Sequence, residues 1–391
     1  MVDFNFSPWP SFTDEETEAV GRVLRSNRVN YWTGEEGRAF EREYAAWVGT
    51  DHAVAVANGT VALDVIWPVL GIGPGDEVIC TPRTFVASAS TIAMAGARPI
   101  FADVDRDTQN ITPRSVEPLI TPRTRAILCV HLAGWPCDMK GFIDLAETND
   151  LFLVEDCAQA HGAQIAGRSV GSFGHVNAWS FCQDKIITTG GEGGMVTLSD
   201  EDRWKRVWSY KDHGKNWDAV YNRHHAPGFR WLHESFGTNW RMTEMQAAIG
   251  RIQLRRMPQW HAVRKRNAAR LQDAFTRLSA LRVPEVPSDI EHAWYKFYAF
   301  VRPEALRSGW TRDRIMTEIN KAGVPCYSGI CPEVYREKAF VAAGLAPAQR
   351  LPNAVELGET SLMFLVHPTL TDAEIDKTIS VTEEVVRRAT R

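Results

Sequence analysis

The stretch LFLVEDCAQAHGAQIAGRSVGSFGHVNAWSFCQDKIITTGGEGGMVTL, residues 151–198, decides the fold class of this chain. Its three short apolar runs have the length of buried β-strands; they are LFLVED (151–156), AWSF (178–181) and GMVTL (194–198). Asp156 ends the first run, and Lys185 follows the second inside a turn-rich segment. Active-site residues of α/β proteins gather at the carboxyl ends of strands. The stretch therefore predicts an α/β sheet with an active site at the edge where its strands end.

Four more runs of the same kind precede this stretch and alternate with helix-like segments. They are AVAVA (53–57), EVICT (77–81), PIFADV (99–104) and AILCVHL (126–132). Repeated strand-helix-strand units predict an α/β fold with a mostly parallel central sheet flanked by helices. We assign this sheet to a large domain of residues 16–254, which follows an N-terminal extension of residues 1–15.

The remainder of the chain predicts a smaller C-terminal α+β domain, residues 255–391. Residues 244–277 have the pattern of a long helix that joins the two domains, with a break expected at Pro258. Beyond it, residues 294–301 predict a strand and residues 311–323 predict a helix. The chain length of 391 residues is sufficient for two domains.

Charge and composition exclude several classes of protein. The formal net charge of −4 gives no attraction to nucleic acid or to an anionic membrane. The basic residues between 255 and 270 are interpreted as a solvated helix face. No apolar window approaches the length of a membrane span and no signal-like pattern opens the chain, so we expect a cytoplasmic protein. The seven cysteines are scattered without a CxxC pair, which predicts reduced thiols and no metal site.

Asp156, Ser180 and Lys185 place an acid, a hydroxyl and an amine at successive strand ends. A carboxylate at a buried strand end needs a partner, and a protonated pyridine nitrogen would be one. A nucleophilic lysine has to lose its proton, and an imine with a carbonyl cofactor achieves this. Taken alone, Asp156 is better explained by a structural role and Lys185 by a surface charge. Together they predict pyridoxal 5′-phosphate (PLP) as cofactor, with Asp156 keeping its ring nitrogen protonated.

Two earlier segments add a candidate phosphate site and a candidate ring contact. Asn58, Gly59 and Thr60 lie between a predicted strand and a helix start, where free backbone N–H groups bind phosphate. Phe85 follows the strand at 77–81, where its ring could stack on a flat cofactor. An ordinary helix cap and a core aromatic are the alternatives. The order of these signals along one sheet predicts a fold-type I PLP enzyme.

The chain resembles the DegT/StrS-type sugar aminotransferases over nearly its whole length. The stretches that carry the resemblance are VANGTVALDV (56–65), GIGPGDEVICTPRTFVASAS (71–90), PIFADVD (99–105), AILCVHLAGWPCDM (126–139), LFLVEDCAQAHGA (151–163), WSFCQDKIITTGGEGGMV (179–196) and GTNWRMTEMQAAIG (237–250). The glycine run TTGGEGG is one residue longer than the TTGEGG that is common in the family.

The resemblance implies a role for each candidate residue. It implies that Asp156 meets the pyridine nitrogen, Gln159 lies by the ring oxygen, Ser180 and the Gly59–Thr60 turn bind the phosphate, Phe85 stacks on the ring and Lys185 forms the imine. Asn239 matches an asparagine that reaches the cofactor phosphate of a neighbouring subunit, so a homodimer with shared active sites is implied. Some relatives carry histidine in place of the lysine and dehydrate sugars, so a lysine at 185 favours amino transfer.

The resemblance also implies the reaction. L-glutamate would be the amino donor, pyridoxamine 5′-phosphate the form that carries the amino group, and a nucleotide-linked keto-sugar the acceptor. We expect a 4-keto-6-deoxy sugar and an amino-sugar product used in polysaccharide or glycan biosynthesis. A 3-keto sugar or a cyclitol ketone is the alternative acceptor, and a non-catalytic PLP-binding regulator is the alternative from another class.

Residues 210–240 form a long segment that is rich in aromatic and histidine side chains and has little periodicity. Long irregular segments inside compact domains are usually functional. We interpret six of its residues as candidates for substrate contact near the dimer interface, with simple interface packing as the alternative. They are Trp217, Tyr221, His224, His225, Arg230 and Trp231.

Overall fold

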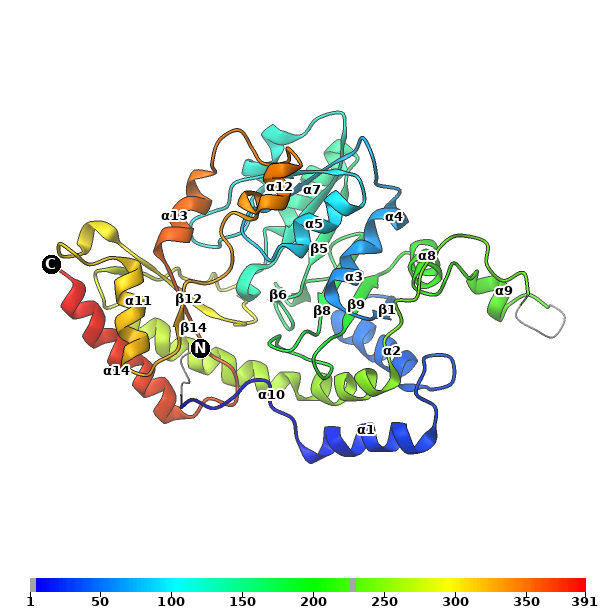
Figure 1. Cartoon of the computed structure of the whole chain (residues 1–391), viewed down its shortest axis with the longest axis horizontal. Helices are drawn as coiled ribbons and strands as arrows, with labels where there is room; N and C mark the ends of the chain where they lie inside the picture. The colour runs from blue at the N-terminus through cyan, green and yellow to red at the C-terminus, as the bar shows by residue number, and fades with distance from the viewer. Residues whose placement is uncertain (1–4, 225–229) are drawn as a thin grey trace.

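The computed structural model describes residues 5–224 and 230–391, and a seven-stranded sheet is its largest element (Figure 1). In spatial order the strands are β1 (His52–Val56), β9 (Gly194–Leu198), β8 (Val176–Ser180), β5 (Phe152–Asp156), β4 (Thr124–Val130), β2 (Glu77–Cys80) and β3 (Arg98–Phe101). Only β9 runs antiparallel to its neighbours in this sheet. Each apolar run predicted as a strand of the large domain is one, and the predicted α/β fold with a mostly parallel sheet is confirmed.

Helices cover both faces of this sheet, which explains why its strands are continuous apolar runs. They are α2 (Glu36–Val48), α3 (Gly59–Asp64), α4 (Ile66–Leu70), α5 (Ala87–Met94), α6 (Pro113–Val116), α7 (Met139–Asn149) and α8 (Glu201–Lys211). Successive residues of β5 point to opposite faces. Val154 lies in one core cluster with Trp67 of α4, and Leu153 lies in another with Phe142 of α7.

The long helix α10 (Glu244–Phe275) continues without interruption through Pro258, so the expected break there was wrong. A proline ring removes one backbone N–H from a helix. Here the helix tolerates the lost hydrogen bond because both of its halves are fixed by packing. The first half packs against α1 (Asp14–Ser26) and α2, and the second packs against α14 (Asp372–Ala389). The proposed boundary after residue 254 falls inside this helix, so no linker separates the two parts of the chain there.

A second, antiparallel sheet lies beyond α10. Its strands are β10 (Leu281–Arg282), β12 (Phe297–Val301), β14 (Ser361–Phe364) and β13 (Cys326–Tyr327), in that spatial order. The helices of this part are α11 (Arg312–Lys321), α12 (Lys338–Ala342), α13 (Pro352–Thr360) and α14. A small third sheet joins β11 (Ile290–Glu291), β6 (Gln164–Ile165) and β7 (Arg168–Ser169). Within the described residues, none of the helices combines the length and apolar character that crossing a membrane requires.

Residues 212–224 and 230–239 belong to an arm that projects from the body of the protein beside α8 (Figure 1). The short helix α9 (Trp217–Tyr221) lies on it. Two β-bridges, Asp212 with Asn239 and Lys215 with His233, hold the two sides of the arm together near its base. The arm is therefore an ordered projection over its described residues.

Candidate active site

All the residues predicted to contact the cofactor, except Asn239, line one cavity of about 620 Å³, which we call the Lys185 cavity. They are Asn58, Gly59, Thr60, Phe85, Asp156, Gln159, Ser180 and Lys185. Asp156 and Ser180 are the last residues of the parallel strands β5 and β8, and Asn58 directly precedes α3. The cavity thus lies where the carboxyl ends of strands meet the start of a helix, as the strand pattern predicts.

The carboxylate of Asp156 is buried in this cavity and held in place from two sides. Its Oδ2 accepts a hydrogen bond of 2.7 Å from the Ser88 hydroxyl, and its Oδ1 accepts one of 3.1 Å from the backbone N–H of Ala158. Burial raises the pKa of Asp156, while these two bonds and the charge of Lys185 act in the opposite direction. A buried carboxylate of this kind is stabilised by a cationic partner in the cavity.

Lys185 lies in the segment between β8 and β9, and contacts distant in sequence fix its position. Its Nζ lies 5.1 Å from the centre of the Tyr295 ring. Its backbone carbonyl accepts a hydrogen bond of 2.8 Å from the indole N–H of Trp9, so the N-terminal segment holds the lysine turn. The Tyr295 hydroxyl donates to the carboxylate of Asp184, the residue before the lysine. The backbone of the lysine turn is therefore fixed, and the Lys185 side chain lies beside the Tyr295 ring at the edge of the cavity.

The turn at Asn58–Thr60 and the end of β8 approach each other closely because Gly59 and Gly194 have no side chain. A Cβ on Gly59 would lie 2.5 Å from the Cβ of Ser180, and one on Gly194 would lie 2.3 Å from the carbonyl oxygen of Asn58. Asn58 caps α3 by accepting a bond from Val61 N–H. The backbone N–H groups of Gly59 and Thr60 have no acceptor among the described residues, which is the usual state of anion-binding turns. These features fit the phosphate end of PLP.

Gln159 and Phe85 complete the walls of the cavity. The Gln159 side-chain oxygen accepts a hydrogen bond of 2.9 Å from the backbone N–H of Ala133, so its amide is fixed. The Phe85 ring is 59% exposed at the cavity, so the alternative of a core aromatic was wrong. An exposed flat ring beside a cavity is available to stack on a flat ligand.

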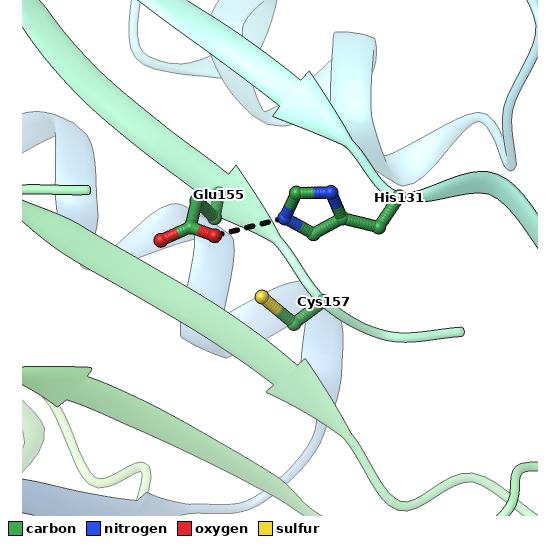
Figure 2. Close-up of side chains that lie close together, drawn as sticks. All are labelled: His131, Glu155 and Cys157. Atoms are coloured by element: carbon green, nitrogen blue, oxygen red, sulfur yellow. Dashed lines mark hydrogen bonds and ion pairs between the residues drawn. The ribbon is translucent and has the colours of Figure 1, made fainter. Parts of the chain in front are cut away.

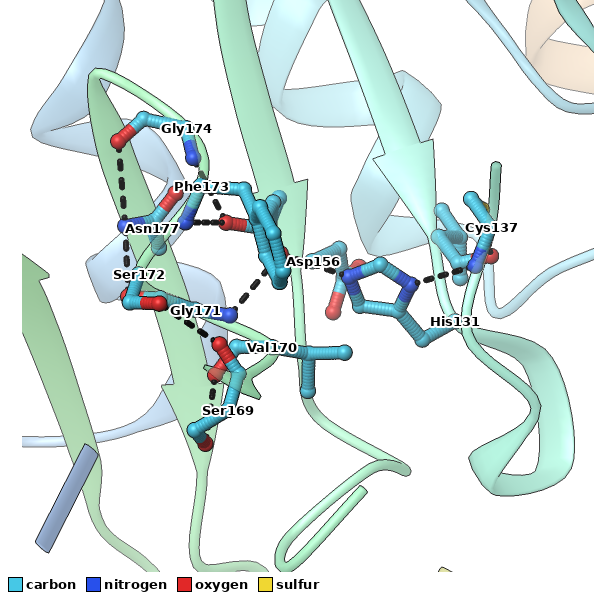
Figure 3. Close-up of polar contacts among 12 residues, drawn as sticks. His131, Cys137, Asp156, Ser169, Val170, Gly171, Ser172, Phe173, Gly174 and Asn177 are labelled. Atoms are coloured by element: carbon cyan, nitrogen blue, oxygen red, sulfur yellow. Dashed lines mark hydrogen bonds and ion pairs between the residues drawn. The ribbon is translucent and has the colours of Figure 1, made fainter. Parts of the chain in front are cut away.

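A buried network behind Asp156 was not expected from the sequence. Glu155 is the preceding residue of β5 and points to the opposite face of the sheet, where His131 and Cys157 lie close to it (Figure 2). One carboxylate oxygen of Glu155 accepts from the His131 ring at 2.9 Å and from Gly171 N–H at 2.8 Å. The other accepts from the backbone N–H groups of Phe173 and Gly174 at 2.8 Å and 2.6 Å (Figure 3).

This network is structural, because its polar atoms are already engaged. The Nδ1 of His131 accepts a hydrogen bond of 3.0 Å from the backbone N–H of Cys137, so Nε2 carries the proton that it donates to Glu155. Both ring nitrogens and both carboxylate oxygens are thereby used. Glu155 fixes the loop 169–174 to the end of β5 and so holds the strand that carries Asp156. Two consecutive acids at a strand end are the sequence signal that would have revealed it.

The arm residues predicted to contact substrate do not line the Lys185 cavity of their own chain within the described residues. Trp217 packs at 4.5 Å and 4.8 Å, between ring centres, from Trp204 and Trp208 of α8 in its own chain. Tyr221 lies near Trp208, and the Trp231 side chain is 91% exposed. His224 and Arg230 are exposed, and His225 lies outside the described residues.

Comparisons with known proteins agree over nearly the whole chain. A sequence model of the DegT/DnrJ/EryC1/StrS aminotransferase family matches residues 10–383. The chain is 35% identical to the spore coat polysaccharide biosynthesis protein SpsC of Bacillus subtilis, over 98% of both chains. It is also 35% identical to the dTDP-3-amino-3,4,6-trideoxy-alpha-D-glucose transaminase of Streptomyces venezuelae, over 96% of this chain and 93% of that one.

A solved structure extends the agreement to three dimensions. The aminotransferase from Psychrobacter cryohalolentis is 59% identical and superposes with a TM-score of 0.97, over 98% of this chain and 99% of that one. The resemblance found in the sequence is thus confirmed. The chain belongs to the DegT/DnrJ/EryC1/StrS aminotransferase family and is a PLP-dependent aminotransferase of fold type I.

Proposed function

We propose that this enzyme transfers an amino group from L-glutamate to a nucleotide-linked keto-sugar, and that the acceptor is a 4-keto-6-deoxy sugar. The observation that carries the proposal is the placement of a buried carboxylate, Asp156, and the Lys185 amine in one cavity with an anion-binding turn. The names of the two similar relatives, which concern a spore polysaccharide and a dTDP-sugar, support a nucleotide sugar as the acceptor.

The residues of the Lys185 cavity divide into those that hold the cofactor and one that moves protons. Asp156 would hold the ring nitrogen, Gln159 the ring oxygen, Phe85 a face of the ring, and Ser180 with Gly59 and Thr60 the phosphate. When bound, PLP supplies the electron sink that stabilises negative charge on the donor's α-carbon. Asp156 supports this chemistry because a carboxylate beside the ring nitrogen favours its protonated form.

Lys185 would take the proton from the donor's α-carbon and later return a proton to the carbon of the acceptor that receives nitrogen. A side chain with this role has to be close to the reacting atom and deprotonated when it acts. The contacts of Tyr295 with Lys185 and of Trp9 with its backbone carbonyl keep the amine near the cavity. One lysine thus serves both half-reactions.

Amination at C3 is the second candidate. It is favoured by the name of the Streptomyces venezuelae relative, which specifies a 3-amino sugar. A 4-keto and a 3-keto sugar place the reacting carbon at different distances from the nucleotide. The two candidates therefore predict different acceptors for the same lysine.

A panel of acceptors tests the proposed reaction. With L-glutamate as donor, we expect the enzyme to aminate a dTDP- or UDP-linked 4-keto-6-deoxy sugar at least about tenfold faster than a 3-keto sugar nucleotide or a cyclitol ketone, because one methylene-sized change in fit is worth about that factor. Mass spectrometry of the products identifies the aminated carbon. A faster reaction with the 3-keto sugar selects the second candidate, and amination of the cyclitol alone contradicts a nucleotide-sugar substrate.

We also propose that the enzyme is a homodimer in which Asn239 completes the partner's cofactor site. Asn239 is exposed at the base of the arm and does not line the Lys185 cavity of its own chain within the described residues. An exposed asparagine held by a β-bridge is well placed to contact a second subunit. Activity should then follow the concentration of dimer.

A mixed dimer of Lys185→Ala and Asn239→Ala chains tests the shared site. If Asn239 serves the partner, both defects fall in one site and the other site is intact. Cofactor affinity at the lysine-bearing site is then expected to equal that of the parent. If Asn239 serves its own chain, the lysine-bearing site carries the asparagine defect, and its affinity is expected to be about tenfold weaker, as for a lost bond to a charged group. Titration of the purified heterodimer with PLP separates the two results.

A further inference from the structure

A second cavity of about 510 Å³ adjoins the Lys185 cavity, and we call it the Lys296 cavity. Its walls come from the N-terminal residues 6–9, from β12, β13 and β14, and from the loop that contains Ile330. Gln159, Asp184, Tyr295 and Ile330 line both cavities, so the two spaces meet at these side chains. The size lies within the range of about 300–1,000 Å³ that is usual for small-molecule sites.

Lys296 is the one cationic side chain among the described residues that line this second cavity. The other basic residue is His367, and burial lowers its pKa to about 3, so it is neutral. The Nζ of Lys296 lies 4.8 Å from the centre of the Tyr295 ring, and it forms no ion pair or hydrogen bond with any described residue. Burying a charged amine without a hydrogen-bond acceptor costs free energy of folding, unless a bound ligand supplies the acceptor.

The charges around Lys296 are arranged to leave it available. Burial lowers the pKa of Lys296 to about 8, with repulsion from Arg264 and Lys185 acting in the same direction and attraction to Asp184 acting against it. The carboxylate of Asp184 is already engaged by the Tyr295 hydroxyl. The Tyr298 hydroxyl accepts a bond from Ile330 N–H at 3.1 Å. Lys296 is therefore a charged group that is mostly protonated at pH 7 and lacks a counterion of its own.

Lys296 and Lys185 both lie over Tyr295. Their amines are 4.8 Å and 5.1 Å from the same ring centre, so they are separated by no more than the sum of these distances. A small substrate that reacts at Lys185 can therefore place an anionic group at Lys296. The flat side chains of Phe6, Trp9 and Tyr327 leave room for an apolar or ring-shaped part beside that group.

We propose that the Lys296 cavity is a substrate subsite that binds an anionic group, with the Lys296 ammonium as its anchor. This rests on the proposed amino transfer between a dicarboxylic amino acid and a nucleotide-linked sugar. Both substrates carry a suitable anion, the side-chain carboxylate of the donor or the diphosphate of the acceptor. An anion beside Lys296 restores its pKa, so binding near pH 8 takes up a proton.

The test is isothermal titration of the PLP-bound enzyme with 2-oxoglutarate, UDP and dTDP. Four proteins are compared: the parent, Lys296→Met, Lys296→Arg and the control Lys321→Met. Lys321 ends α11 with a 69% exposed side chain, so its variant loses the same charge far from either cavity. Titrations at pH 8 in two buffers of different protonation enthalpy report the proton uptake.

We expect Lys296→Met to weaken one class of probe by at least about tenfold and to lose the proton uptake, with Lys296→Arg and Lys321→Met close to the parent. Weaker 2-oxoglutarate binding assigns the subsite to the donor, and weaker nucleotide binding assigns it to the acceptor. The proposal is overturned if Lys296→Met binds every probe within about twofold of the parent, or if the parent binds none of the probes. A parent that binds the probes but aminates no sugar nucleotide contradicts the proposed function while supporting the subsite.

Discussion

Replacing Lys185 by alanine is expected to lower the turnover number for amino transfer by at least about 10⁴-fold while leaving the fold intact. The loss is large because, in the proposed mechanism, one amine both binds the cofactor covalently and moves the proton at the reacting carbon. The fold should be unaffected because the Lys185 side chain faces a cavity and its backbone is held through the Trp9 bond, which alanine preserves. Single-turnover kinetics and thermal unfolding of the same preparation measure both effects.

Chemical labelling checks that Lys185 itself is the reactive lysine. Borohydride reduction of the PLP-bound parent fixes the bond between a lysine nitrogen and the cofactor, and peptide mapping then locates it. We expect the label in the peptide that contains Lys185 and no label in the Lys185→Ala protein. The Lys296→Met protein is the matched control, because Lys296 is the other lysine over Tyr295 and its loss should leave the label in place. A label on Lys296 in the parent would refute the assignment.

Asp156→Asn is expected to slow amino transfer by about 10²- to 10⁴-fold, with cofactor binding reduced much less. An amide of the same size keeps the shape of the site, but it cannot hold the pyridine nitrogen protonated. The slowed step should be removal of the α-carbon proton, so substitution of deuterium at that carbon should slow the variant more than the parent. Stopped-flow absorbance with L-glutamate follows this step directly.

Ser88→Ala provides the graded control for that variant. It removes the hydroxyl that donates to Asp156 but leaves the carboxylate and its bond from Ala158 N–H. A smaller loss than in Asp156→Asn is expected, with the same step slowed. Turnover of Asp156→Asn near that of the parent would show that Asp156 has only a structural role.

The strands and the contents of the Lys185 cavity were predictable because both depend on local sequence. Buried strands have continuous apolar runs, such as residues 126–130 of β4, and the residues at their ends lie at one edge of a parallel sheet whatever the details of packing. The strand pattern alone therefore places residues that are far apart along the chain, such as Asp156 and Thr60, near each other.

Contacts that depend on distant packing were not predictable. Trp9 lies near the N-terminus, and Tyr295 and Lys296 lie in the segment just before β12. No periodicity in the sequence links them to Lys185. Pro258 suggested a break that packing on both halves of α10 prevents. The sequence does not show which aromatic residues of the arm pack within the chain, because tertiary packing decides it: Trp217 packs on α8, whereas the Trp231 side chain is exposed.

The network around Glu155 has a consequence for recombining relatives into chimeric enzymes. Its parts come from three separate segments. The end of β5 supplies the carboxylate, residues 169–174 donate backbone N–H bonds to it, and residues 131–137 supply the histidine and the N–H that donates to this histidine. A crossover between residues 156 and 169 would combine the Glu155 carboxylate of one parent with the loop 169–174 of another, whose backbone N–H groups must donate to it. The three segments should consequently be taken from the same parent, and a crossover placed after β9 keeps them together.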